Sequence, residues 1–93
     1  MPPDGDADEI RLQVPAEAPM GGVVRVALRV LGGRAGLPEP EIDAVRRSVG
    51  DAFAAMVAQG DPGPVEVVVA VTPGHLQIEL TGASSARTVN APR

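Results

Sequence analysis

One segment constrains the fold of this chain more than any other, because residues 42–57 carry an apolar stripe of helical spacing. The stripe repeats every three or four residues and consists of Ile42, Val45, Val49, Ala52, Phe53 and Met56. On an α-helix this spacing places the side chains on one face, which packs against another layer of the domain. Acidic residues at positions 39 and 41 suit the positive end of the helix dipole. We therefore predict a helix from about residue 39 to residue 58.

A second helix is predicted earlier in the chain, beginning near Pro19 and ending at Gly36. Its core-facing residues are expected to be Val23, Val24, Ala27, Leu28 and Leu31. Gly36 is free to adopt the left-handed conformation that ends many helices, and Leu37 is placed for the apolar contact that often accompanies it. This helix contains costly glycines, so we expect it to be the softer of the two.

Strands are indicated where apolar and polar residues alternate. Ile10, Leu12 and Val14 alternate in this way before the first helix, and residues 65–71 are rich in valine. Residues 76–81 alternate again after the turn-forming sequence Thr-Pro-Gly at 72–74. The order of elements is therefore strand, helix, helix, strand, strand.

These elements predict an α/β (α+β) two-layer sandwich, in which two helices pack on one face of a small sheet. The far face of the sheet is predicted to be open, polar at its margins, with Val68 and Ala70 as an apolar strip in the middle. We expect a single domain over residues 9–82, between a flexible acidic tail (1–8) and a flexible tail (83–93). The strand at 76–81 would then have a bare edge, and bare edges pair with other chains.

Composition excludes several classes of function. A net charge of −4 argues against a nucleic-acid partner, which needs clustered basic residues. The chain has no Cys, Trp or Tyr, so thiolate metal sites and most aromatic stacking platforms are unavailable. The start of the chain is acidic and contains no signal-peptide pattern, and no apolar run is long enough for a membrane span. We expect a cytoplasmic protein without a membrane partner.

Several framework segments, in this order, resemble the anti-sigma-factor serine kinases, a branch of the GHKL (histidine-kinase-like) ATPases common in actinobacteria. The resemblance covers residues 10–82, and the segments are residues 10–16, Val24-Arg25, residues 34–37, Ile42-Asp43, Arg46 and residues 76–80. It implies the first half of the GHKL fold. It also implies a place in sigma-factor signalling.

In that family the second helix carries a Glu that acts as general base and, four residues later, an Asn that binds magnesium. Here Asp51 and Ala55 fall at these two positions, and Ala55 has no oxygen to offer a metal. The family's adenine-reading Asp-x-Gly-x-Gly box is also not found after Gly82. The chain therefore resembles a degenerate, truncated member. We expect no enzyme activity, no catalytic residue, no metal and no cofactor, with Asp51 as the single remaining candidate for nucleotide contact.

Other candidate sites are better explained as solvated surface. His75 follows a Pro-Gly turn and has no second metal ligand near it in sequence. The acidic residues 4–9 imitate the start of a calcium loop, but the positions for its Gly and its closing Glu hold Glu9 and Pro15. Ser84 and Ser85 are possible phosphorylation sites marked only by their expected exposure.

The leading hypothesis is a non-catalytic regulatory protein-binding module that forms a homodimer or binds a partner protein. The partner would be a sigma factor, an anti-sigma antagonist or a kinase relative. The predicted interface residues lie on the open sheet face and on the outer face of the second helix: Val68, Ala70, Asp51, Ala54, Ala55 and Ala58. Two alternatives stay open. One is a nucleotide-binding serine-kinase fragment completed by another chain, and the other is a small structural or ligand-binding domain.

Overall fold

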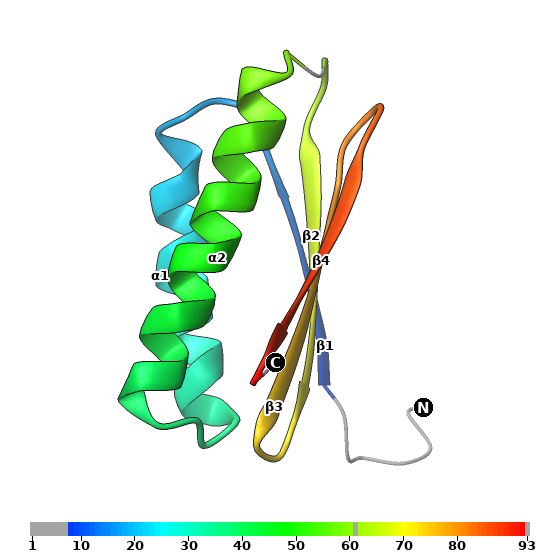
Figure 1. Cartoon of the computed structure of the whole chain (residues 1–93). Helices are drawn as coiled ribbons and strands as arrows, with labels where there is room; N and C mark the ends of the chain where they lie inside the picture. The colour runs from blue at the N-terminus through cyan, green and yellow to red at the C-terminus, as the bar shows by residue number, and fades with distance from the viewer. Residues whose placement is uncertain (1–7, 61, 93) are drawn as a thin grey trace.

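The computed structural model describes residues 8–60 and 62–92. Its elements are β1 (Asp8–Val14), α1 (Met20–Arg34), α2 (Glu39–Ala58), β2 (Val65–Thr72), β3 (His75–Thr81) and β4 (Ala86–Ala91). The strands form one antiparallel sheet in the order β1-β2-β3-β4, and both helices cover the same face of it (Figure 1). The predicted two-layer α+β fold is confirmed, and the sheet has one strand more than predicted.

The additional strand, β4, lies in the segment that was predicted to be a flexible tail. It pairs antiparallel with β3, so that Val89 is opposite Ile78 and Ala91 is opposite Leu76. The predictions of a tail over residues 83–93 and of a bare β3 edge were therefore wrong. Only two positions of β4 bear apolar side chains toward the helices, so its pattern is weak, and its order comes chiefly from backbone pairing with β3. Residues 1–7 of the other predicted tail lie outside the described residues.

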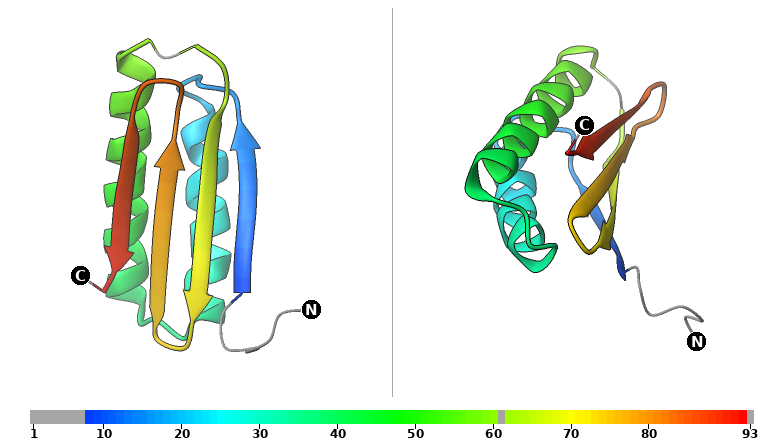
Figure 2. Two further views of the ribbon diagram at one scale, coloured as in Figure 1. Left: turned by 90° about the vertical axis from the view of Figure 1, so that its right-hand side faces the viewer. Right: turned by 60° about the horizontal axis from the view of Figure 1, so that its bottom comes forward.

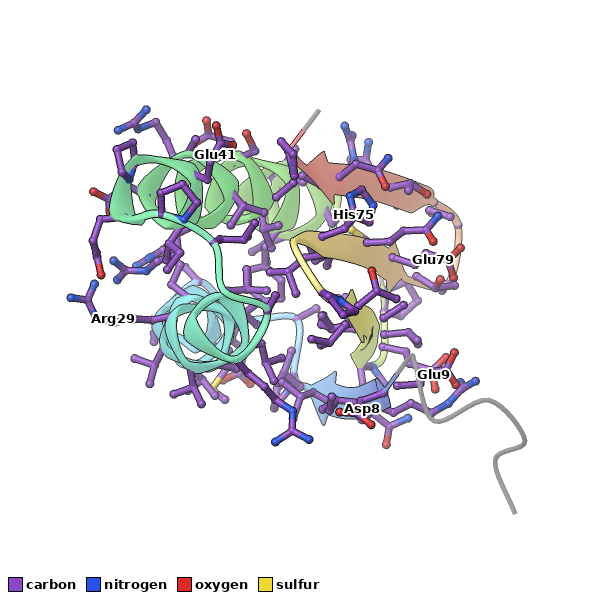
Figure 3. The ribbon with its side chains drawn as sticks, turned by 90° about the horizontal axis from the view of Figure 1, so that it is seen from below. Asp8, Glu9, Arg29, Glu41, His75 and Glu79 are labelled. Carbon is purple, nitrogen blue, oxygen red and sulfur yellow. The ribbon has the colours of Figure 1, made fainter. Side chains whose placement is uncertain are left out.

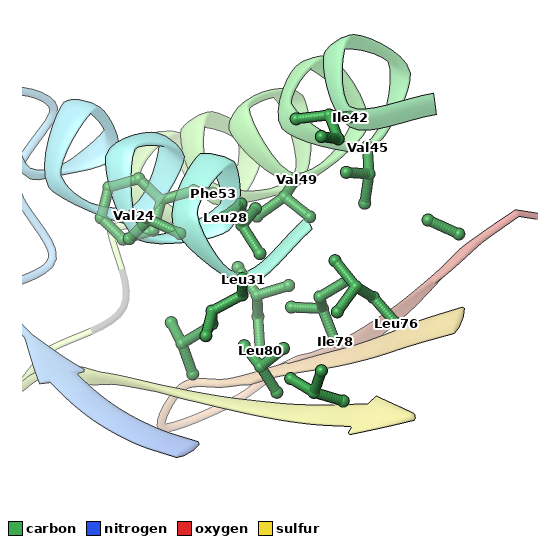
Figure 4. Close-up of a cluster of buried hydrophobic side chains, with 14 of the residues drawn as sticks. Val24, Leu28, Leu31, Ile42, Val45, Val49, Phe53, Leu76, Ile78 and Leu80 are labelled. Carbon is green, nitrogen blue, oxygen red and sulfur yellow. The ribbon is translucent and has the colours of Figure 1, made fainter. Parts of the chain in front are cut away.

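The core lies between the sheet and the helices, as predicted. Val65, Val67, Val69 and Val71 of β2 are all at most 5% exposed. Their neighbours on β1 and β3 point to the same side, because residues directly opposite each other in an antiparallel pair share a face. Figure 4 shows the helix side chains that meet them, which include Val24, Leu28, Leu31, Val49 and Phe53.

The helices approach each other closely where α1 ends. A Cβ atom placed on Gly32 would lie 2.7 Å from Cγ1 of Ile42, so only glycine fits against α2 at this point. Gly36 then adopts a left-handed φ of 79°, and the Leu37 N–H donates to the Gly32 carbonyl at 3.0 Å. Leu37 is buried. The predicted helix stop is thus confirmed as a Schellman motif.

The helix layer is displaced toward one side of the sheet. Figure 2 shows α2 directly behind β4 and α1 behind β2, and contacts between α2 and β4 agree with this view. The outer strand β1 is covered less, so Ile10 and Leu12 are only half-buried. The face of β4 is therefore covered by α2, whereas the same face of β1 is covered less.

Candidate protein-binding surfaces

The outward side of α1 carries three exposed valines, which we call the valine face. Val23, Val26 and Val30 are 48%, 61% and 66% exposed. They follow one another at intervals of three and four residues, so they form a stripe along the helix. The prediction that Val23 faces the core was wrong. Val24, four residues before Leu28, takes the core position, and its neighbour Val23, about 100° away around the helix axis, is left partly exposed.

Positive charge flanks the valine face. The helix α1 contains three arginines and no acidic residue. Arg34 is held by Asp8 of β1 at 2.7 Å, whereas Arg29 points away from the molecule and forms no ion pair with any described residue (Figure 3). Arg25 lies toward α2, close enough to Gly50 that a Cβ there would be 3.1 Å from its Nη1 atom. The surface is therefore apolar and basic on a chain with a net charge of −4.

The open face of the sheet carries the predicted residues Val68 and Ala70, but long polar side chains surround them. Both residues are half-buried, and they line a small hollow of about 100 Å³ with Glu9, Gln77 and Glu79. Arg11, opposite Val68, joins this rim through ion pairs with Glu9 at 3.0 Å and Glu66 at 3.6 Å. This strip consists of two half-buried residues, whereas the valine face consists of three exposed ones.

The predicted face of α2 divides into two parts. Ala54 and Ala58 are exposed and lie outside the two hollows beside β4 described below, and Ala55 is half-buried. Asp51 is exposed and lines a groove of about 460 Å³ between α2 and the end of β4. We call this the α2–β4 groove; its walls include Glu41, Ala44, Ser48, Asp51, Asn90 and Pro92.

The groove continues along β4 toward the start of β3. This second part measures about 530 Å³ and shares Ser48 and Asn90 with the first. His75 lines it, as the first residue of β3, and is half-buried rather than fully solvated. Thr88 and Val89 of β4 also line it. The β4 edge therefore lies beside a continuous hollow.

The remaining candidates are a metal or calcium site and the phosphorylation of two serines. Within residues 8–60 and 62–92, no cluster of three or more His, Cys, Asp or Glu is arranged to hold a metal. Residues 4–7 of the calcium-like sequence lie outside those ranges. Ser84 and Ser85 belong to the β3–β4 turn, which the Gly82 N–H closes by donating to the Ser85 carbonyl at 2.8 Å. No described helix has the length and apolar character needed to cross a membrane.

Comparisons of this chain with protein-family models and with curated proteins give no match. The relationship to the anti-sigma-factor serine kinases therefore stays a prediction from the framework segments.

Two surfaces were missed by sequence reasoning, the valine face and the β4 edge. The first had a visible signal, because residues 20–34 contain no acid and valines recur at 23, 26 and 30.

Proposed function

We propose that this chain is a non-catalytic regulatory module that acts by protein contact and forms a homodimer through the valine face. One observation carries this proposal: the solvent side of α1 bears a stripe of three exposed valines, Val23, Val26 and Val30. Exposed apolar residues that gather in one patch often mark a protein–protein contact. Burying the exposed surface of each valine in an interface contributes on the order of 1.5–2 kcal/mol of favourable free energy to association.

A second copy is the partner that fits the stripe most simply. The spacing of three and four residues is the spacing by which the side chains of paired helices interlock. A two-fold interface uses the same patch on both subunits, so a straight apolar stripe is complementary to itself. Gly22 and Gly33 beside the stripe have no side chain that would hold the helices apart. Arg29 would remain at the solvated rim, where like charges cost little.

For the regulated partner we propose a sigma factor, an anti-sigma antagonist or a kinase relative. The support is the resemblance of the framework segments to anti-sigma-factor serine kinases, together with Ala55 at the magnesium position. A nucleotide-binding fragment completed by another chain is a second candidate, because Asp51 lines the α2–β4 groove. The charged residues that line the groove are Glu41, Asp51 and Arg47. Two carboxylates and one guanidinium group would repel a negatively charged triphosphate more than they attract it. Calorimetry with Mg-ATP separates the two candidates, since only the second predicts heat of binding.

Sedimentation equilibrium tests the dimer. The wild-type chain should sediment as a dimer, and Val26→Arg should give a monomer because it places a charge in the centre of the stripe. Ala54→Arg is the matched control, since it adds the same side chain to an exposed position on α2 and should leave the dimer intact. A wild-type monomer at about 1 mM, where association would be weaker than about −4 kcal/mol, would contradict the proposal.

A further inference from the structure

We propose that the α2–β4 groove binds an extended, basic segment of a partner protein, which adds to the sheet as a further strand beside β4. In the described sheet β4 is paired on one side only, with β3. The backbone groups along its other side are therefore not bonded within the sheet. An edge of this kind can accept an extended peptide through main-chain hydrogen bonds.

The two edges of the sheet differ in how they are protected. The β1 edge carries charged residues at three of its first four positions, and Arg34 reaches it from α1 to pair with Asp8 at 2.7 Å. Charged side chains on an edge discourage pairing with another strand. The β4 edge has a single charge, Arg87, followed by the uncharged residues Thr88, Val89 and Asn90. Of the two edges, β4 is the one open to an added strand.

The groove leaves room for that strand. Neighbouring strands lie about 4.8 Å apart, so a strand added to β4 would run along the groove beside α2. Ala44 and Ser48 on the α2 wall are short, and the volume of about 460 Å³ continues into the second part at Thr88. Alternate side chains of the added strand would point toward α2.

The charge of the groove indicates the chemistry of the segment. Glu41 and Asp51 both stand on the α2 wall, and neither forms an ion pair with a described residue. Arg47 is the one basic residue that lines the groove with them, so acidic side chains outnumber basic ones there. Ten residues separate them, which is about 15 Å along a helix. On a strand, two residues four positions apart share a face and lie about 13 Å apart. The preferred segment therefore carries two basic residues at positions i and i+4.

A second copy of this chain does not fit the same edge. Antiparallel pairing of two β4 strands about a two-fold axis would place both α2 helices on the same face of the joined sheet. Because α2 lies directly over β4, the helices would be held little further apart than two strands, about 4.8 Å (Figure 2). Packed helices need about 8–10 Å. A lone strand avoids this collision, and it leaves the valine face of α1 free for the dimer.

The direct test uses synthetic peptides and the full ¹⁵N-labelled chain. The test peptide is an acetylated, amidated nonapeptide of alternating threonine and valine with arginine at its third and seventh positions. We expect shifted amides at Thr88, Val89 and Asn90, with new exchange protection at Thr88 and Asn90 only, because the backbone N–H groups of successive strand residues point alternately to the two neighbouring strands and that of Val89 points to β3. An isomer with the two arginines adjacent should bind more weakly, and a version N-methylated at alternate residues should not bind. Equal binding of the N-methylated peptide, shifts confined to other surfaces, or no binding would overturn the proposal.

Two alanines on α2 provide a matched pair of variants. Ala44→Arg fills the groove and reverses its charge, so it should weaken peptide binding by at least about tenfold, or about 1.4 kcal/mol. Ala54→Arg makes the same change outside the groove and should leave affinity within about twofold. Equal losses in the two variants would contradict the site. The inference rests on the proposed function only in assuming that the chain acts by protein contact. Val26→Arg should abolish the dimer without affecting peptide binding. The two proposals can therefore fail separately.

Discussion

The two helices pack on the same sheet with similar apolar stripes, but their outward faces differ. α2 presents charged and small residues such as Asp43, Arg47 and Ala54 to solvent, so it is complete as an amphipathic surface helix. α1 presents Val26 and Val30 instead. The inward apolar stripe of a helix explains why it packs on the sheet. The outward face shows whether the helix exposes further apolar residues that another molecule could cover. By this comparison α2 exposes mostly polar and small residues, whereas α1 exposes a stripe of valines.

The largest effect is expected on the inward side of α2. Phe53 is 1% exposed and has the largest volume among the fully buried side chains of the described residues. Phe53→Ala should cost about 3–5 kcal/mol, comparable to the total stability of a small domain. Urea denaturation followed by circular dichroism should show a largely unfolded variant. Phe53→Leu, which keeps most of the volume, should remain folded.

A smaller effect is expected where the helices meet. Gly32→Ala places a Cβ within 2.7 Å of Ile42, so overpacking of about 1–3 kcal/mol should outweigh the gain in helix propensity of about 1 kcal/mol. Gly33→Ala has no atom within 4 Å of its Cβ and should stabilise the same helix by up to about 1 kcal/mol. At low protein concentration, where the monomer is measured, the two variants should therefore shift the urea midpoint in opposite directions. Stabilisation by both would mean that α1 and α2 are not in close contact.

The smallest effects are expected on the outward faces. Asp51→Ala should change the free energy of unfolding by less than about 0.5 kcal/mol, because the residue is exposed and unpaired among the described residues. Val30→Gln should likewise change monomer stability little at low protein concentration. At high concentration it should lower the urea midpoint relative to wild type, since it removes part of the interface. If the urea midpoint of the wild-type chain did not depend on protein concentration, the outward face of α1 would form no interface, and in this respect it would not differ from that of α2.

The parts of the fold that could be predicted are those with strong local signals. The α2 stripe, the valine-rich β2 and the Gly36 helix stop each carry a regular spacing or a backbone requirement in a few residues. The strand β4 could not be predicted in this way, because it depends on pairing with β3 across a turn. Val23 was misplaced since adjacent valines 23 and 24 both satisfy a loose helical pattern, and only the packed structure selects Val24.

The candidate surfaces were harder to predict than the fold. Sequence reasoning placed Val68 on the open sheet face between polar margins, which the structure confirms, and it found Asp51, but it could not show that Asp51 lines a groove. Exposure is a property of the whole packing arrangement, and hydrophobicity alone assigns every valine to the core. The apolar residues that the structure leaves uncovered are therefore informative.

The central claim is that the valine face of α1 is covered by a second copy. Isotope-filtered nuclear Overhauser spectra of a mixture of methyl-labelled and unlabelled chains test it most directly, because they detect only contacts between copies. The account predicts intermolecular signals from the methyl groups of Val23, Val26 and Val30, and none from Val68. Intermolecular signals from Val68 alone, or no such signals at α1 under any concentration of the protein, would contradict it.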